Sequence, residues 1–363
     1  MYRKYWTLLD GYILKKFLTT FFFAIIIIAL IACVIDYTQK VDDFVLRKPS
    51  NAQLLWYYIC FIPQISALLF PLFIFIATIF FTSKMAYRTE IIAILASGVS
   101  YTRFLRPYVV GGCLLGGVSL LANHIVVPLA SQEIHEFHIK FIWNDPFASD
   151  RNLHLRLSPK EYVYIQNFDY SNLEMSKFTL ETIEDNKLQK KISAEMGYYD
   201  TLTNEWLLKQ VVVRTYDTGI SENLEVLKEL RGSYGLTPEI ILNDDRIKNN
   251  LTTSQLLEEI ENQRIRGVGT LNSFLFELYK RSAQPFAGLV LCIIGACLAS
   301  NKVRGGSGLH LAIGIAGSAV YMLFLQFSQT FTINAGVNPL LSMWIPNIFF
   351  SIIAYIMYRR NIR

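Results

Sequence analysis

The residues best placed to do chemistry lie in a short segment, 89–98, between two long apolar runs. Ile91, Ile94 and Leu95 recur at helical spacing and Gly98 provides a stop, so the segment predicts a short amphipathic helix at about 86–98. Glu90 stands beside this apolar stripe. A carboxylate in that position suits docking into the groove of a partner protein, where it would meet an arginine. A helix lying on lipid, with Glu90 stabilising its first turn, fits the pattern equally well.

Three basic residues follow the first apolar run. Lys40, Arg47 and Lys48 are expected just beyond its end, at the level of the lipid headgroups. Ammonium and guanidinium groups pair well with phosphate, so these side chains could hold an anionic headgroup. The default alternative is a set of solvated loop charges balanced by Asp42 and Asp43.

The sequence carries no recognisable catalytic or metal-binding motif. It contains no G-x-x-x-x-G-K-[ST] phosphate loop, no H-E-x-x-H and no G-x-S-x-G, which disfavours a nucleotide site and an enzyme. The five cysteines all lie within apolar runs, so neither a disulfide framework nor a zinc site is predicted. No cofactor is expected in this chain.

The elements that must position these residues follow from hydropathy. Of 363 residues, 52% are hydrophobic and 17% are charged, which indicates an integral membrane protein. A helix needs about 20 mostly apolar residues to cross a bilayer. Five uncharged runs are long enough, and the last divides at a turn-forming cluster, 334–339, so that six spans are predicted. The runs are Phe17–Ile35, Leu54–Ser83, Pro107–Gln132, Ser282–Asn301 and Gly305–Tyr358.

The chain has an acidic central stretch and basic flanking parts. The stretch Glu133–Glu277 holds 24 acidic and 16 basic residues, while the rest of the chain has a net charge of +13. The bases flank apolar runs and form no patch of their own, which disfavours a nucleic-acid binder. The positive-inside rule then places both termini in the cytoplasm and the acidic insert outside. The runs hold no Asp, Glu, Lys or Arg, which disfavours an ion-coupled transporter.

The insert at 133–250 changes from helical to alternating spacing. Several short strands joined by turns predict an antiparallel sandwich or jelly roll. Its apolar face is either the core of a rigid domain or the interior of an open roll that takes an acyl chain, and the pattern leaves both possible. The candidates for an acyl path on this face are Ile192, Ala194, Met196, Tyr198 and Leu208.

The chain returns to the membrane through a predicted linker helix. Thr252 caps it, Gln255 bonds back to the cap, and Leu251 packs on Leu256, as in a capping box with a hydrophobic staple. The expected organisation is three spans with the short helix at 1–132, the sheet domain at 133–250, and the linker helix with three further spans at 251–363.

Motifs spread over nearly the whole chain resemble those of the LptF/LptG permease family, the membrane subunits of the lipopolysaccharide-exporting ABC transporter. Their order, their spacing and the six-span topology are together specific. The motifs are Glu90-x-x-Ala93 through Gly98-x-Ser100, Val127-Pro128-x-Ala130, Ala194 through Trp206-x-Leu208, Glu277-x-x-x-Arg281-x-x-x-Pro285 and Trp344-x-Pro346-Asn347.

The resemblance implies an α-helical inner-membrane subunit with six transmembrane helices and a periplasmic β-jellyroll whose interior accepts lipid. It implies a second LptF/LptG-type permease as partner, LptC/LptA-type jellyroll bridge proteins, and a cytoplasmic ABC ATPase dimer that binds ATP and Mg²⁺ and docks at Glu90. Where the family presents basic residues to lipid A phosphates, this chain offers Lys40, Arg47 and Lys48. Lipopolysaccharide export is the expected function, and a non-transporting envelope scaffold or regulatory protein with a protein-binding ectodomain is the alternative.

Overall fold

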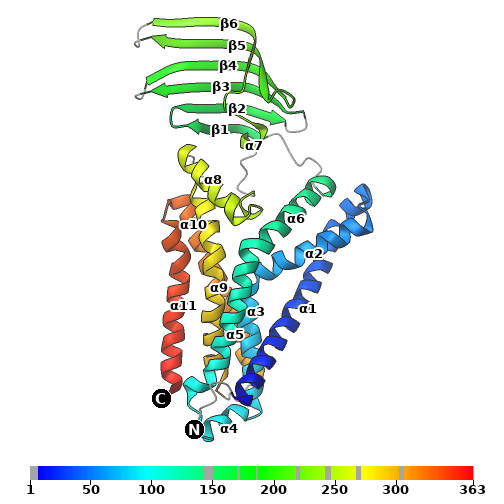
Figure 1. Cartoon of the computed structure of the whole chain (residues 1–363), viewed down its shortest axis with the longest axis vertical. Coiled ribbons are helices and arrows are strands. Elements are labelled where there is room, and N and C mark those ends of the chain that lie inside the picture. Colours follow the sequence, from blue (N-terminus) through cyan, green and yellow to red (C-terminus); the bar gives the residue numbers. More distant parts are fainter. Residues whose placement is uncertain are drawn as a thin grey trace. The chain divides into compact units, whose positions relative to one another are not determined.

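The computed structural model of the chain describes residues 7–142, 150–169, 172–184, 187–217, 221–241, 247–266, 271–301 and 306–362. The chain divides into two compact units, whose elements are labelled in Figure 1. The helical unit comprises Met1–Ile142, Lys248–Leu256 and Asn272–Arg363, and the sheet unit comprises Trp143–Ile247 and Leu257–Leu271.

The helical unit is built from long apolar helices joined by shorter ones. Within the described residues, six helices are long and apolar enough to cross a membrane, which confirms the six predicted spans. The helices of this unit are α1 (Leu8–Arg47), α2 (Asn51–Leu68), α3 (Phe70–Tyr87), α4 (Glu90–Ala96), α5 (Tyr101–Leu121), η1 (Ala122–Val126), α6 (Val127–Phe141), η2 (Ile247–Asn249), α9 (Leu271–Ala299), α10 (Gly306–Ala335) and α11 (Pro339–Ile362).

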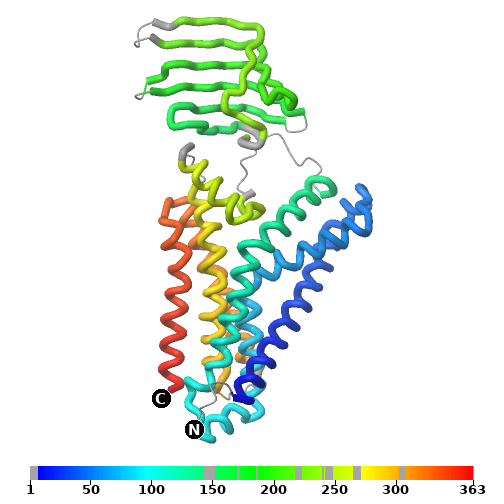
Figure 2. The backbone as a smooth tube through the Cα atoms, in the orientation of Figure 1, coloured from blue at the N-terminus to red at the C-terminus, as the bar shows by residue number. Residues whose placement is uncertain are grey.

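The second apolar run differs from its expected form. The sequence predicts one helix over Leu54–Ser83, whereas the structure divides this run into α2 and α3 at Leu69. Pro71 lies in the first turn of α3, where its missing N–H leaves no bond unmade, and Pro63 removes one bond inside α2. Of the two helices, only α3 has the length and hydropathy of a span. α2 turns back beside the end of α1 (Figure 2).

The sheet domain begins later than the predicted boundary at 133. α6 continues the third span to Phe141, because Ile134 and Phe137 lie at helical spacing and are buried together with Phe44 of α1. The predicted boundary at 250 also shifts, since residues 248–250 belong to the helical unit. The first correction arises because charged residues at the end of a span do not stop a helix that still has an apolar face to bury. The second arises because Arg281 and Gln132 bond the backbone carbonyls of Lys248 and Asn250.

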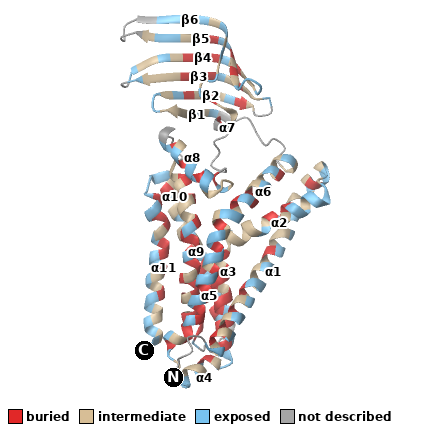
Figure 3. Ribbon diagram, in the orientation of Figure 1, coloured by how far each residue is buried: buried red, intermediate tan, exposed pale blue. Residues whose placement is uncertain are grey.

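α3 and α9 form the centre of the helical unit (Figure 3). In each, 72% of the most apolar window is buried, against 11% for α1 and 22% for α10. Glycines of α5 allow close packing on α9: a Cβ added at Gly112 would lie 2.9 Å from Leu289, and one at Gly116 would lie 3.3 Å from the Pro285 carbonyl oxygen. By contrast, α1 and α10 keep wide apolar faces that the described part of the chain does not cover.

The sheet unit is a six-stranded antiparallel sheet in which each strand pairs with the next one in the chain. This confirms the predicted antiparallel β domain. A short helix, α7 (Pro238–Ile241), follows the last strand. The strands are β1 (Asp150–Ser158), β2 (Glu161–Asp169), β3 (Glu174–Glu184), β4 (Lys187–Asp200), β5 (Glu205–Asp217) and β6 (Ser221–Gly232).

One face of the sheet is buried. Buried and exposed side chains alternate along each strand, and in β3, β4 and β5 this alternation shifts by one residue at positions that lie beside one another. In β4 the buried residues are Ile192 and Ala194 and then Gly197, three positions later instead of two. At these positions, Lys177 of β3 and Gln210 of β5 have φ values of 51° and 55°, in the left-handed region. Because side chains alternate between faces, residues of the same parity before and after the shift lie on opposite faces.

The linker helix α8 (Thr253–Arg266) begins with the predicted capping box. The Thr252 N–H donates to Oε1 of Gln255 at 2.9 Å, and the Gln255 N–H donates to the Thr252 hydroxyl at 3.5 Å. Leu256, the first apolar residue of the helix, is fully buried. The capping box therefore determines that α8 begins directly after Thr252.

Candidate functional site

α4 is a two-turn helix between the second and third spans. Thr89 precedes it with φ 62°, and Gly98 follows it with φ 87°, so a left-handed residue stands at each end. Glycine adopts this conformation without strain, which explains the predicted stop at Gly98. The helix is shorter than predicted, because residues up to Tyr87 belong to α3.

The apolar stripe of α4 faces its own bundle. Ile91 is 1% exposed, and Ile94 and Leu95 are half-buried against the same cluster, which includes Met85 and Tyr101. Ile91 is therefore used within the chain and not free to enter a partner's groove, while docking of a partner at this helix stays a prediction. The side chains that α4 leaves exposed are Ile92, Ala93 and Ala96.

Glu90 lies half-exposed in the first turn of α4. Its carboxylate accepts a hydrogen bond from the Tyr12 hydroxyl of α1 at 3.4 Å and lies 3.9 Å from the Arg88 guanidinium. Such long, partly solvated contacts contribute little energy, so they leave the carboxylate available to a partner. Asp10 of α1, which is 2% exposed, pairs with Arg103 of α5 at 2.6 Å and holds the start of α1 in place.

At the other end of α1, Lys40 lies in a polar cluster with side chains from α2 and α6. Its Nζ is 2.6 Å from Oδ1 of Asp36 and 2.6 Å from the Tyr57 hydroxyl. Nε2 of His138 lies 3.3 Å from both Lys40 Nζ and the Tyr57 hydroxyl, and the Tyr58 hydroxyl donates to Asp36. Sequence reasoning missed Asp36, although its spacing of four residues from Lys40 on one helix is a visible signal.

The three bases predicted to hold a headgroup differ in their contacts. The counter-ion of Lys40 is Asp36, not the later acids of α1. Arg47 donates to the backbone carbonyl of Lys140 at 3.2 Å. Lys48 ends α1 with φ 50° and an exposed side chain. An anionic headgroup at Lys40 would compete with a carboxylate already in contact, and the three-base headgroup site stays a prediction.

A further polar cluster, absent from the predicted sites, joins α9 to the segment that precedes α8. Arg281, 3% exposed, donates to the backbone carbonyls of Lys248 at 3.1 Å and Leu251 at 2.9 Å. It also donates to the Thr253 hydroxyl at 3.3 Å, and Glu277 lies 3.5 Å from its Nε. A guanidinium has five donors in fixed directions, so one side chain satisfies several acceptors. A Glu and an Arg four residues apart at the start of a span are the signal that could have predicted it.

The predicted acyl-path residues divide between the two faces of the sheet. Three lie in the buried core, namely Ile192, Ala194 and Leu208. The prediction that Met196 and Tyr198 share this face is wrong, because the alternation changes phase between Ala194 and Gly197. Lys209 Nζ instead lies 4.9 Å from the centroid of the Tyr198 ring, and Lys209 pairs with Met196 across the strands.

The segment after β6 completes the core of the sheet unit. Nε1 of Trp206 donates to the Leu236 carbonyl at 2.7 Å, and Leu236 and Ile241 pack into the core. The hydroxyl of Tyr234 is buried and has no hydrogen-bond partner in the described part of the chain. Burial raises the pKa of the Tyr234 phenol, and the Glu205 carboxylate raises it further. The apolar interior is thus closed on one side by a short segment that is held by the Trp206 hydrogen bond and by the packing of Leu236 and Ile241.

Comparison with known protein families identifies the family of this chain. The family model described as lipopolysaccharide export system permease LptF/LptG matches residues 11–360, from the first turns of α1 to the last turn of α11. None of the curated protein sequences compared with the chain matches it. The family match covers both units, the helical one and the inserted sheet. The chain belongs to the LptF/LptG family of lipopolysaccharide export permeases and is a multi-pass inner-membrane protein.

Proposed function

We propose that this chain is the permease subunit of an ATP-driven exporter that extracts lipopolysaccharide from the inner membrane and passes it to a periplasmic bridge. The distribution of Lys and Arg supports an orientation with both termini and α4 in the cytoplasm and the sheet unit in the periplasm. The chain has no phosphate-loop motif of its own. In this proposal ATP and Mg²⁺ are therefore bound by a separate ABC ATPase dimer.

The main support for coupling to an ATPase is that α4 is buried on one side and exposed on the other. Ile91 fastens the helix to the core of the bundle, while Ile92, Ala93 and the half-exposed carboxylate of Glu90 remain accessible. A short helix that is fixed on one side and open on the other transmits a push into the spans instead of swinging freely. The ATPase dimer would contact the open side, with an arginine or lysine of its own beside Glu90.

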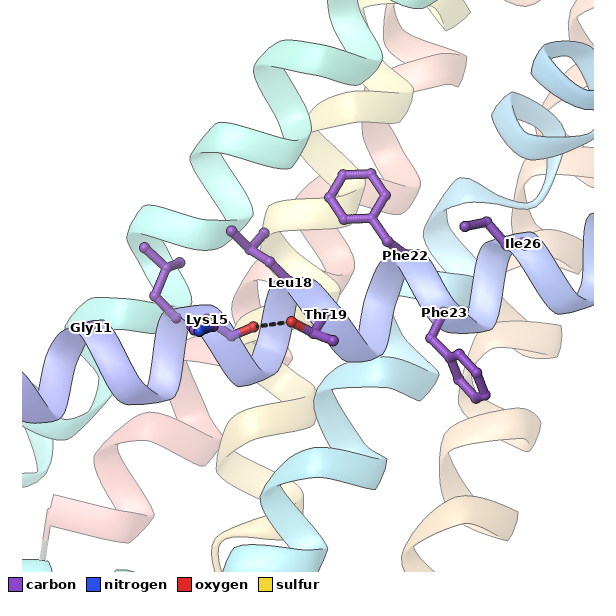
Figure 4. A pocket seen from close by; sticks show the side chains of 8 residues that line it. Gly11, Lys15, Leu18, Thr19, Phe22, Phe23 and Ile26 are labelled. Carbon is purple, nitrogen blue, oxygen red and sulfur yellow. Dashed lines mark hydrogen bonds between the residues drawn. The ribbon is translucent and has the colours of Figure 1, made fainter.

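The open face of α1 supports a partner within the membrane. Its apolar residues border a groove of about 670 Å³ that runs along this one helix, with Leu18, Phe22 and Ile26 among its lining (Figure 4). The Thr19 hydroxyl is turned back to the Lys15 carbonyl at 2.7 Å, which removes a polar group from this surface. In the proposal, a second LptF/LptG-type permease faces this surface and the acyl chains of lipopolysaccharide lie between the two.

The sheet unit supplies the exit in this proposal. Ile192, Ala194 and Leu208 line an apolar core, and the segment at Leu236 covers it. Acyl chains would replace contacts made by that segment, and an LptC/LptA-type jellyroll would continue the apolar path by pairing with an edge strand.

Affinity purification in mild detergent followed by mass spectrometry tests the proposal. The wild-type chain is expected to bring down an ABC ATPase, a second permease and lipopolysaccharide. The Glu90→Lys variant is expected to lose the ATPase or its stimulated hydrolysis, while Asp42→Lys, the same charge change at an exposed site of α1, is expected to keep both. A stable complex without an ATPase, or normal outer-leaflet lipopolysaccharide after depletion of the chain, would show instead that this protein is a non-transporting scaffold.

A further inference from the structure

A groove of about 740 Å³ is formed by α5, α9 and α11 of the helical unit, and is called the α5–α11 groove below. The buried part of its lining is apolar and includes Leu105, Val290 and Ala354. The exposed part includes Val109 and Tyr355. Because all three helices belong to candidate spans, the open side of this groove lies within the membrane. An apolar wall with a few polar groups at one place is typical of ligand-binding pockets.

The polar groups of the groove lie at one end of these helices. Arg106 is in the second turn of α5, and Tyr358 is near the end of α11. Along α11 the lining runs from Tyr358 to Ser351, about 10 Å at the helical rise of 1.5 Å per residue. One half of the hydrocarbon layer is about 15 Å thick. The groove therefore fits within a single leaflet, with its polar end at the headgroups.

Arg106 is the one charged residue that lines this groove among the residues described. Its side chain is exposed and makes no ion pair or hydrogen bond within the described part of the chain. The two acids at this end of the unit lie beside other bases: Asp10 pairs with Arg103, and Glu90 lies 3.9 Å from Arg88. An arginine at headgroup level without a carboxylate partner attracts a phosphate group.

Two hydroxyl groups add to the polar end of the groove. The hydroxyls of Thr102 and Tyr358 lie 2.9 Å apart and connect α5 to α11. Only one of their two protons is needed for this contact, so the other hydroxyl can donate to an oxygen of a ligand. A guanidinium with a hydroxyl donor, next to an apolar wall, matches a phosphate that carries an acyl chain.

We propose that the α5–α11 groove binds an anionic phospholipid of the cytoplasmic leaflet, with its phosphate at Arg106 and an acyl chain along the apolar wall. The assignment to that leaflet rests on the orientation given in the proposed function. One arginine and one narrow apolar wall match a lipid with one phosphate and two acyl chains better than the several phosphates and chains of lipopolysaccharide. Because α5 begins shortly after α4, the bound lipid stabilises the helices beside the proposed ATPase contact.

The test uses the full complex reconstituted in vesicles of equal parts phosphatidylglycerol, which is anionic, and phosphatidylcholine, which is zwitterionic. A photo-crosslinking amino acid at Val109 is expected to capture phosphatidylglycerol about tenfold in excess, the effect of one charge-assisted contact. The same crosslinker at Val118, an exposed position of α5 outside the groove, is expected to capture both lipids equally. Equal capture of the two lipids at Val109, or capture there of lipopolysaccharide or of a protein, would overturn the inference.

Arginine substitutions identify the group that selects the lipid. Arg106→Gln is expected to remove the preference at Val109, and Arg106→Lys is expected to keep most of it. Arg360→Gln, the same change at an exposed base of α11 that does not line the groove, is expected to leave the preference unchanged. Arg106 is exposed, so the variants are expected to fold, which an unchanged melting temperature in lipid-free detergent would verify. An undiminished preference in the Arg106→Gln variant would overturn the inference.

Thermal unfolding distinguishes a bound lipid from free phosphate. Phosphatidylglycerol added to the complex in detergent is expected to raise the melting temperature of the wild type more than that of Arg106→Gln. Inorganic phosphate at the same concentration is expected to raise neither. An equal rise with inorganic phosphate would overturn the assignment to a lipid.

The same preparations separate this inference from the proposed function. A complex that contains the ATPase but shows no lipid preference at Val109 would overturn the lipid site and leave the export function standing. A complex that shows the preference but contains no ATPase would overturn the export function and leave the lipid site standing.

Discussion

The guanidinium of Arg281 in α9 donates a 2.9 Å hydrogen bond to the backbone carbonyl of Leu251, the residue just before the cap of the linker helix. A second bond reaches the Lys248 carbonyl at 3.1 Å. One buried side chain of the fourth span thus holds the segment through which the chain returns from the sheet unit. A mutation cannot remove the backbone carbonyls that accept these hydrogen bonds. The two hydrogen bonds can therefore be removed only by changing Arg281.

Arg281→Met is expected to lower the free energy of unfolding by about 3 kcal/mol, because it leaves the backbone carbonyls of Lys248 and Leu251 without the donor that Arg281 supplies. Thermal and denaturant unfolding of the purified protein in detergent measure this. Arg264→Met is the control, since Arg264 and its partner Glu261 are both 60% exposed, and it is expected to change stability by less than about 0.5 kcal/mol. Equal effects of the two variants would contradict the role given to Arg281.

The contact between Asp36 and Lys40 predicts a specific pattern of non-additivity. Asp36→Asn alone is expected to destabilise the chain by about 2 kcal/mol, because Lys40 keeps its charge in a half-buried site without a counter-ion. Adding Lys40→Met is expected to restore most of that loss, since it removes the uncompensated charge. A double-mutant cycle by denaturant unfolding measures the coupling. Strictly additive effects would show that the two groups are solvated independently.

Neighbouring isoleucines of α4 are predicted to have different roles. Ile91→Asp places a carboxylate in the core of the bundle and is expected to lower stability by about 4 kcal/mol. Ile92→Asp changes an exposed position, so stability is expected to stay within about 0.5 kcal/mol of wild type while ATPase stimulation falls. Unfolding curves and ATP hydrolysis by the reconstituted complex test the pair. Full stimulation in the Ile92→Asp variant would contradict docking on this face.

The two faces of the sheet are predicted to differ in lipid contact. A photo-crosslinker at Leu208, in the buried core, is expected to capture lipopolysaccharide during ATP-driven export. The same crosslinker at Met196, on the opposite face, is expected to capture none or far less. Mass spectrometry of the crosslinked products measures both. Capture at Met196 alone would place the acyl path on the other face.

The arrangement of spans could be predicted from sequence because membrane crossing imposes a simple requirement. A run such as Pro107–Gln132 has no charge and enough length, and little else can satisfy that pattern. The break at Leu69 could not be predicted, since Pro63 and Pro71 interrupt hydrogen bonding without changing hydropathy. The same holds for α6: its extension to Phe141 depends on burial against Phe44, a residue on another helix.

For the functional residues, sequence patterns predict positions but not contacts. Glu90 and Gly98 are where the sequence places them, but an amphipathic stripe does not say whether it faces a partner or its own chain, and Ile91 faces its own chain. Alternation alone predicts Met196 on the same face as Ala194, and this prediction fails because the strand changes phase between Ala194 and Gly197. Lys40 was visible as a base, whereas its contacts with Tyr57 and His138 join residues from helices far apart in the sequence.

The length of α1 has a mechanical consequence. A helix of 40 residues is about 60 Å long, twice the thickness of the hydrocarbon layer. It therefore reaches water on both sides of the bilayer as one unbroken lever. Its near end is held by the Asp10–Arg103 pair and its far end by the contacts of Lys40. Between them one side of α1 packs on α3 and α5, and the other side stays exposed. If α1 moves as one straight rod, a tilt at the Asp10–Arg103 pair displaces the contacts of Lys40 on the other side of the bilayer.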